Sequence, residues 1–206
     1  MARSNKEAVR QLAVVANRQG GYFTTKQAIE AGYGYKHLDY HETAGNFERV
    51  DHGLYHLPTV PRAEHDDLIR LALWSRNQKD EPQAVVSHES ALVLHELTDL
   101  LPNRIHLTVP RTFRKPVPKG CMLHKATLAD GDVEERAGFR VTTPLRTLLD
   151  AAAGNVSQEQ LSKAVKDALE RGLVRRSKLT QALGGSPNLT RLRAAFSSGK
   201  TKSRIA

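Results

Sequence analysis

The chain has 206 residues, 39% hydrophobic and 26% charged, which is the composition of a globular protein with one large domain or two small ones. Its single cysteine excludes an internal disulfide framework, argues against a cysteine-rich zinc site and fits a reducing compartment. The sequence has neither the roughly 20 apolar residues of a membrane span nor the apolar segment of a signal peptide, so we expect a cytoplasmic protein without membrane contact.

The net charge of +9 is unevenly distributed along the chain. Residues 1–60 contain seven Lys/Arg against six Asp/Glu, whereas residues 104–125 contain six basic residues and no acidic one. Residues 162–206 contain eleven basic residues against two acidic ones. Concentrated positive charge favours an anionic partner, usually nucleic acid, although a solvated surface with a basic tail would have the same composition.

Residues 1–60 predict three helices and a β-hairpin. Turn and capping residues set the boundaries: Thr24 and Gln27 form a capping box, and Gly53 allows a tight corner. The predicted elements are a helix from Ser4 to about Arg18 with Val9, Leu12, Ala13 and Ala16 on one face, a strand at Tyr22-Phe23, helices from Thr24 to Gly32 and from Tyr35 to Gly45, and a hairpin over 46–58. This order is that of a winged helix-turn-helix, in which the hairpin is the wing.

In a winged helix-turn-helix, the third helix enters the major groove with the side that the core does not cover. We expect Leu38 to point inward with Ala28, Ile29, Phe47 and Val50, and the following residues to face outward: Tyr35, Lys36, Asp39, Tyr40 and Thr43. Phosphate contacts suit Lys36 and either Thr25 or Lys26, base contacts suit Tyr40 and Thr43, and phosphate or minor-groove contacts suit Arg49 and His52 in the wing.

Two acidic residues on the third helix keep a second interpretation open. Asp39 and Glu42 would repel phosphate unless they bind a cytosine amino group or face a partner, and winged helices also serve as protein-interaction modules. His41 lies one turn from Leu38, on the packed side, and is interpreted as a core histidine.

Residues 62–184 predict a second, mixed α/β domain. An amphipathic helix over 64–78 is followed by a buried strand, AVVSH, and by helix ESALVLHEL, then by strands in IHLTVPR, CMLHKATL and FRVTT. Three helices follow, over 144–154 with Pro144 in its first turn, over 157–172 with Ser157 as its cap, and over 177–183. The overall fold class is therefore α+β. Residues 185–206 are rich in Ser, Gly, Lys and Arg, and we expect this basic tail to be partly disordered.

The order of these segments resembles the AbiEi family of antitoxin-type transcriptional regulators from bacterial abortive-infection (type IV) toxin–antitoxin systems. The resemblance extends from residue 4 to about residue 183 and is most specific in GLYHLP and VTTPLRTLLD; it also includes SHESALVLHELTDLLP, IHLTVPR and GCMLHKATLADGDVEERAGF. It implies an N-terminal winged helix that binds operator DNA. From the outward Lys36 and Tyr40 and the excess positive charge, we expect this operator to be an inverted repeat in the protein's own promoter, and the protein to be a monomer in solution or a cooperative pair on DNA. The resemblance also implies a C-terminal domain that neutralises a nucleotidyltransferase-like toxin encoded next to it. The third helix departs from the strongly basic family type by carrying Asp39 and Glu42.

No catalytic, cofactor or metal site follows from the residues. A restriction-type nuclease would need an acidic residue and a Glu-x-Lys or Asp-x-Lys pair, and no such pair follows Asp150. DGDVEER is interpreted as a solvated turn, and the nine histidines are scattered without ligand spacing. Ser87-His88-Glu89 are consecutive and cannot form a triad. We therefore predict a protein without enzymatic activity.

A second basic patch lies in the acid-free stretch between two predicted strands. It consists of Arg111, Arg114, Lys115 and Lys119, in a loop interrupted by prolines. Its partner could be DNA beside the operator or an acidic face of the toxin, and a solvated mobile loop is the third reading. Arg146 and Asp150 are spaced as an i,i+4 pair that fixes a helix. The leading function is a DNA-binding autorepressor that is also an antitoxin; the alternative is a regulatory or protein-interaction module without a toxin.

Overall fold

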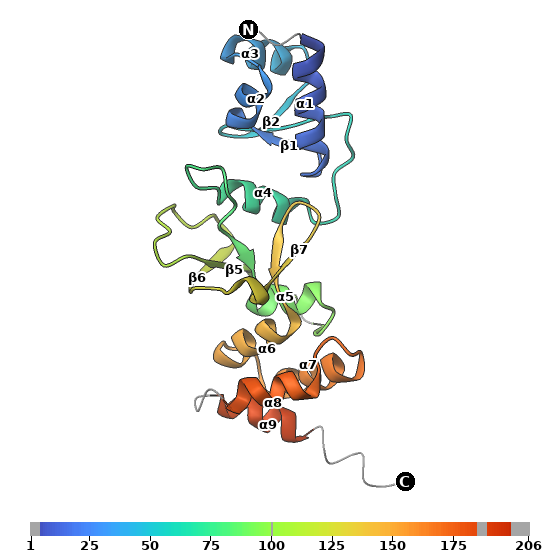
Figure 1. The fold of residues 1–206 in the computed structure, drawn as a ribbon, viewed down its shortest axis with the longest axis vertical. Helices are drawn as coiled ribbons and strands as arrows, with labels where there is room; N and C mark the ends of the chain where they lie inside the picture. The colour runs from blue at the N-terminus through green and yellow to red at the C-terminus, as the bar shows by residue number, and fades with distance from the viewer. Residues whose placement is uncertain (1–4, 100, 185–188, 199–206) are drawn as a thin grey trace. The chain divides into compact units, whose positions relative to one another are not determined.

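The computed structural model of the chain describes residues 5–99, 101–184 and 189–198. Its contacts divide it into two compact units (Figure 1). Unit 1 comprises residues 1–83 and 135–139, and unit 2 comprises residues 84–134 and 140–206. Both contain helices and a sheet, so the predicted α+β class is confirmed.

Unit 1 has the element order of a winged helix-turn-helix. Its elements are α1 (Asn5–Asn17), β1 (Tyr22–Thr24), α2 (Thr25–Ala31), α3 (Tyr35–Thr43), β2 (Glu48–Asp51), β3 (Leu54–His56) and α4 (Asp66–Trp74). The three strands form an antiparallel sheet in the order β1-β3-β2, and β2 and β3 are the wing. The predicted capping box at α2 is present: the Thr24 hydroxyl accepts a hydrogen bond from the Gln27 amide, and the Gln27 side chain accepts one from the Thr24 amide.

Aromatic rings hold the sheet of unit 1 against its helices. Phe23 of β1 stacks on Tyr55 of β3 with centroids 5.5 Å apart and meets Phe47 edge-on at 4.9 Å. The other buried residues of this core are Ala8, Leu12, Ala16, Ala28, Ala31, Tyr33 and Leu38. Leu38 is only 2% exposed, as the sequence predicts, and it fixes which side of α3 faces outward.

Two residues expected in this core are exposed, and two others, Ala13 and Val50, are only half-buried. Ala8, Leu12 and Ala16, spaced four apart, form the inward stripe of α1, which leaves Val9 50% exposed. On α2 the buried positions are Gln27, Ala28 and Ala31, so Ile29 lies on the opposite side and is 39% exposed.

Helix α4 belongs to unit 1, whereas the sequence analysis placed its residues in the second domain. Tyr22 of β1 donates a hydrogen bond to Asp66 at 2.6 Å, and Ile69 is 1% exposed. Gly138, with φ of +90°, lies against Ile69, where a Cβ atom would be 3.1 Å from the isoleucine side chain. The units therefore divide at residues 83–84 and not between residues 60 and 62, where the sequence predicted the boundary.

Unit 2 is built on a five-stranded sheet covered by helices. Its elements are β4 (Val85–Val86), α5 (His88–Leu94), β5 (Ile105–Val109), β6 (Cys121–Lys125), η1 (Asp130–Asp132), β7 (Val133–Glu135), β8 (Arg140–Thr142), α6 (Pro144–Ala153), α7 (Gln158–Glu170), α8 (Arg176–Gly184) and α9 (Thr190–Ser198). The strand order is β6-β5-β4-β8-β7. β4 pairs antiparallel with β5 and parallel with β8, and β5 pairs parallel with β6.

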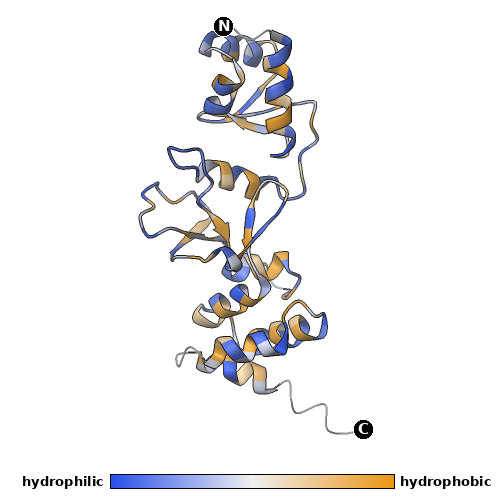
Figure 2. Ribbon diagram, viewed as in Figure 1, coloured by the Kyte–Doolittle hydropathy of each residue, from blue (hydrophilic) through white to orange (hydrophobic). Residues whose placement is uncertain are grey.

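The C-terminal helices make one apolar core of their own. Hydrophobic and hydrophilic residues alternate along them, as expected for helices with one buried face (Figure 2). Leu148, Leu161, Leu179 and Leu192 are completely buried there. α9 corrects the expectation of a disordered tail for residues 190–198, because Leu192, Ala195 and Phe196 recur at helical spacing and are buried. Residues 185–188 and 199–206 of the expected tail lie outside the described residues.

Candidate functional site

The outward face of α3 carries two tyrosines and a lysine. Tyr35 is 70% exposed and Tyr40 is 66% exposed, and Lys36 is also exposed. Burial of Leu38 on the opposite side prevents the helix from turning these groups inward. The face therefore presents phenol hydroxyls and an ammonium group to a partner, together with the exposed Asp39 carboxylate.

Hydrogen bonds within unit 1 already occupy two of the predicted contact residues. The Thr43 hydroxyl is exposed but donates to the backbone carbonyl of Asp39 at 2.9 Å, which leaves it free only to accept from a partner. The Lys26 ammonium donates to the Gln78 carbonyl at 3.0 Å and lies 4.0 Å from the Glu30 carboxylate. Lys26 would have to give up these contacts to bind phosphate, so Lys36 is the better-placed cation.

The wing brings three more predicted residues together. Its corner has Gly53 at φ of +68°, and the Asp51 carboxylate accepts a hydrogen bond from the His52 amide at 2.7 Å. The Thr25 amide donates to the Gly53 carbonyl at 2.9 Å, so the start of α2 lies against the tip of the wing. Arg49 and His52 are exposed, and Thr25 is half-buried. The wing is thus a supported element with one permanent cation.

His41 has the packed environment predicted for it. Its ring lies 4.8 Å from that of Phe47 and 5.5 Å from that of Tyr33, and its Nδ1 atom is 3.1 Å from the Asn46 side-chain amide. Burial lowers the pKa of His41. It is therefore a packing residue and supplies no charge to the α3 face.

An ion network that was not predicted from the sequence lies at the base of the wing. Arg62 binds both carboxylate oxygens of Glu48, at 2.8 and 2.9 Å, and also donates to the Tyr22 hydroxyl at 2.6 Å. That hydroxyl in turn donates to Asp66, and burial together with this carboxylate raises the pKa of Tyr22 to about 12. The network joins β1, β2 and the start of α4, and it neutralises Glu48 at the first residue of the wing. The spacing of these residues along the chain gives no sign of it.

The second basic patch lies on the connection between β5 and β6. Arg111, Arg114, Lys115 and Lys119 are all exposed there. Phe113, within the same loop, is only 4% exposed and anchors it. Because β5 and β6 run parallel, the loop must span the length of the strands, from the last residue of β5 to the first residue of β6. The cations thus lie on the connection that leads into β6, the strand at one end of the unit 2 sheet.

Arg146 holds together two carboxylates of unit 2. Its Nε atom donates to Asp150 at 2.9 Å, which is the predicted i,i+4 pair, and its Nη1 atom donates to Asp132 at 3.1 Å. Asp132 comes from the DGDVEER segment, so that segment is more than a solvated turn. Burial raises the pKa of Asp150, against the lowering effect of Arg146. The arrangement is a structural cross-link between α6 and η1.

Three histidines that the sequence analysis described as scattered form a cluster in unit 2. The rings of His88 and His124 stack with centroids 3.6 Å apart, and the His106 ring is 5.2 Å from His124. The His106 Nδ1 atom lies 2.8 Å from a carboxylate oxygen of Glu89. They come from the start of α5, from β5 and from β6, and only the parallel register of β5 and β6 brings the last two together. That register was the missing signal.

The electrostatics of this cluster favour neutral imidazoles. Burial, followed by the neighbouring His124, lowers the pKa of His88 to about 4. Burial and His106 also lower the pKa of His124. The hydrogen bond from His106 lowers the pKa of Glu89, which is the cluster's one carboxylate. His88 also has a φ of +52°, a strained value for a side chain with a Cβ atom.

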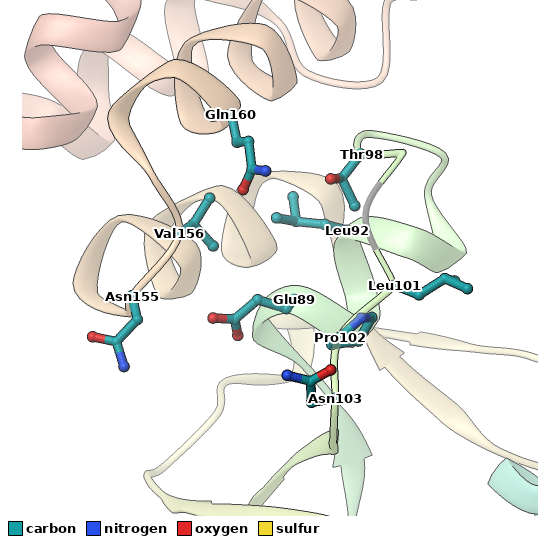
Figure 3. Close-up of a pocket in the computed structure, with 9 residues that line it drawn as sticks. All are labelled: Glu89, Leu92, Thr98, Leu101, Pro102, Asn103, Asn155, Val156 and Gln160. Atoms are coloured by element: carbon teal, nitrogen blue, oxygen red, sulfur yellow. The ribbon is translucent and has the colours of Figure 1, made fainter.

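A pocket of about 190 Å³ opens beside the cluster (Figure 3). Glu89 forms part of its wall, and it is also lined by Leu92, Thr98, Leu101, Pro102, Asn103, Asn155, Val156 and Gln160. Leu92 and Val156 form apolar surface, while the amides of Asn103, Asn155 and Gln160 surround it. This mixture of carbon and amide surface suits a side chain of a protein partner better than an ionic ligand.

Metal ligation is not evident among these groups. Within the residues that the structure describes, no three His, Cys, Asp or Glu side chains are arranged to hold a metal ion. Nor does the described part of the chain contain a helix long and apolar enough to cross a membrane.

Comparisons with known proteins agree with both units. A family model described as "Transcriptional regulator, AbiEi antitoxin" matches residues 10–58, and one described as "AbiEi antitoxin C-terminal domain" matches residues 84–196. The RV2827C protein from Mycobacterium tuberculosis has a similar solved structure, with a TM-score of 0.60 and 17% identity over 97% of this chain and 79% of that one. At this identity the likeness concerns the fold. No curated protein matches the chain.

Proposed function

Because the chain belongs to the AbiEi antitoxin family, we propose that it represses its own promoter through unit 1 and neutralises a nucleotidyltransferase-like toxin through unit 2. The observation that carries the first half is the outward face of α3 beside a supported wing. Tyr35, Lys36, Tyr40 and Arg49 present donors and cations there, without occupied hydrogen bonds in the described structure. Thr25, Thr43 and His52 are secondary contacts in this proposal.

Unit 1 is close to electrically neutral, which limits how tightly it can hold DNA without help. Residues 1–83 and 135–139 carry twelve basic residues against twelve acidic ones, and nonspecific DNA affinity rises with the number of phosphates neutralised. The basic patch at Arg111, Arg114, Lys115 and Lys119 would supply the missing attraction if it binds DNA beside the operator. It would serve the antitoxin activity instead if it binds an acidic face of the toxin.

The second half of the proposal is supported by the extent of the C-terminal match. The model of the AbiEi antitoxin C-terminal domain matches residues 84–196 of the chain. These residues include the sheet of unit 2 and its helices up to α9. The pocket at Glu89 and Leu92 and the basic loop are two surfaces of the described part of unit 2 that could bind a protein partner. The toxin would be the protein encoded next to this gene.

The test uses the full-length chain and DNA from its own promoter. Fluorescence anisotropy with the promoter fragment and with random DNA of the same length and composition should give a preference for the promoter. The slope of log affinity against log salt should fall by about one unit for each phosphate contact removed, for example in Lys36→Ala or in Arg111→Ala. Equal affinity for both DNAs would contradict repression and favour a protein-interaction module.

Antitoxicity is tested separately, by growth of cells that express the neighbouring gene. Full-length protein with Lys36 and Arg49 both changed to Ala should still restore growth, since these residues lie on unit 1. A variant with Arg111, Arg114 and Lys119 changed to Ala should lose protection if the basic loop binds the toxin, and should keep it if the loop binds DNA. Failure of the wild-type chain to restore growth would contradict an antitoxin role.

A further inference from the structure

Helix α3 carries a carboxylate, that of Asp39, which does not stabilise the fold through any described contact. Asp39 is exposed, and within the described residues its side chain makes no hydrogen bond or ion pair. It lies on the outward face between Lys36 and Tyr40. If that face enters a DNA groove, an unpaired negative charge there costs affinity, because every phosphate nearby repels it.

The position of Asp39 along the helix excludes the usual structural use of an acidic residue. A carboxylate in the first turn of a helix stabilises its positive end. α3 begins at Tyr35, so Asp39 lies beyond the first turn and does not have this role. The helix is started by Gly34, which has no side chain to act as a cap. Lys36 is three residues away, and among the described residues it forms no ion pair with Asp39.

The chemistry of the major groove indicates what this carboxylate would bind. A carboxylate accepts hydrogen bonds only, and the donors in the groove are the N4 amino group of cytosine and the N6 amino group of adenine. Adenine places its N7 acceptor beside N6, which repels a carboxylate, whereas cytosine has no acceptor beside its amino group on that edge. Cytosine is therefore the base that Asp39 can recognise.

We propose that Asp39 is a specificity-determining residue that selects a C·G pair in each operator half-site by accepting a hydrogen bond from cytosine N4. The proposal rests on the proposed DNA binding by α3. Tyr35 and Lys36 then hold the backbone, while Asp39 lowers affinity for every sequence except those that offer it a donor. A nearly neutral winged helix gains its selectivity in this way from repulsion as well as from attraction.

This role predicts an unusual combination of effects for Asp39→Asn, which keeps the size of the side chain and removes its charge. Affinity for random DNA should rise, because the repulsion is lost. The preferred base should change from cytosine to adenine, because a carboxamide can donate to N7 and accept from N6 of adenine at once. Glu42→Gln is the matched control, since it removes the same charge from the same helix at a half-buried position.

The experiment selects preferred sites from a pool of randomised duplexes with full-length wild type, Asp39→Asn and Glu42→Gln. Anisotropy on the selected duplexes then measures affinity for all four bases at each position. Wild type and Glu42→Gln should select the same half-site, and replacing one C·G pair should weaken them tenfold to a hundredfold, as estimated for a specific base contact. Asp39→Asn should select adenine at that position alone.

Three possible results distinguish a failure of the proposed DNA-binding function from a failure of the proposed role of Asp39. A wild-type protein that selects no site contradicts both the DNA-binding function and the role of Asp39. A selected site that is the same for wild type and Asp39→Asn keeps the function and overturns the role of Asp39. Equal changes of base preference in Asp39→Asn and Glu42→Gln also overturn it, since the effect would then come from net charge. Thermal unfolding at the wild-type temperature confirms that both variants are folded.

Discussion

The imidazole rings of His88 and His124 stack face to face, with centroids 3.6 Å apart and an angle of 14° between their planes. Stacked rings at this distance cannot both carry a proton without strong repulsion, and among the described residues Glu89 is the carboxylate that lies within ion-pair distance of the cluster. The folded protein therefore keeps this cluster largely neutral, and its stability should depend on pH.

We expect the free energy of unfolding to fall as the pH is lowered from 6.5 to 4. The pKa of His88 is about 4 in the folded protein and about 6.5 when unfolded, so the unfolded chain binds this proton first. Stability from His88 is complete above pH 6.5 and is lost as the pH falls toward 4, by on the order of 2–3 kcal/mol. Urea unfolding followed by circular dichroism at several pH values measures it. Asparagine tolerates a positive φ, so His88→Asn should stay folded and should make the free energy of unfolding less dependent on pH. The same dependence on pH in wild type and His88→Asn would contradict this prediction.

Arg146→Ala should be the most damaging change of a single charge in unit 2. It leaves the buried Asp150 and the half-buried Asp132 without their cation, and breaking a buried pair in this way costs about 3–5 kcal/mol. The pKa of Asp150, already raised by burial, should rise further, so part of the loss should be recovered at low pH. Lys166→Ala is the control, because its pair with Glu170 is exposed and an exposed pair contributes about 0.5 kcal/mol. Equal urea midpoints for the two variants would show that Arg146 is not a cross-link.

Arg49→Ala should weaken binding to promoter and random DNA by similar factors. The guanidinium is always charged and can bind a phosphate or enter a narrow minor groove. His52→Ala should have a smaller effect, because an imidazole lacks the permanent charge and the fork of N–H donors that a guanidinium offers a phosphate. Anisotropy with both DNAs measures the two affinities. If Arg49→Ala leaves both intact while the protein stays folded, the wing is not a DNA contact.

Tyr40→Phe should reduce the preference for the promoter without weakening binding to random DNA. The change removes only the phenol hydroxyl, which is exposed on α3 and can donate to a base edge. A loss of about tenfold in the ratio of the two affinities is expected for one hydrogen bond to a base. Tyr35→Phe, at the start of the same helix, is the comparison, and a larger effect there would place base recognition at the other end of α3.

Gly21→Ala should destabilise unit 1 by more than a conformational penalty alone. Gly21 has a φ of +88°, and an added Cβ atom would lie 2.7 Å from a ring nitrogen of His56, which is itself buried against Tyr22. Gly45→Ala isolates the conformational part, about 1 kcal/mol, since its φ is +74° and nothing lies within 4 Å of its added Cβ. Thermal unfolding of both variants gives the difference. Equal losses would mean that His56 moves aside freely.

Local signals were sufficient to predict the elements of unit 1. Capping at Thr24, glycine at the corner of the wing and the inward position of Leu38 are properties of short stretches, and the structure agrees with each. The errors at Val9 and Ile29 have one cause: a helix with alanines on its inner face leaves larger apolar residues outside. Helical spacing alone does not reveal which of two apolar stripes is buried.

Contacts between distant segments could not be predicted in the same way. The histidine cluster depends on the register of β5 and β6, and the Tyr22–Arg62–Glu48 network depends on where α4 begins. The helix at residues 190–198 was missed because its composition is polar and basic. Its three apolar residues are buried only because α7 presents an apolar face, a fact that lies outside its own sequence.

The short segment 135–139 means that the backbone crosses between the units at three peptide bonds, after residues 83, 134 and 139. A cut at residue 83 would therefore not release two intact modules. The piece lacking unit 1 would keep Gly138 and Phe139 without Ile69 and His65, against which they lie, and the other piece would expose Ile69, which is 1% exposed in the intact chain. A gene fusion or truncation that replaces one unit of this protein must therefore keep segment 135–139 together with α4. Otherwise it will produce apolar surfaces that are prone to aggregation.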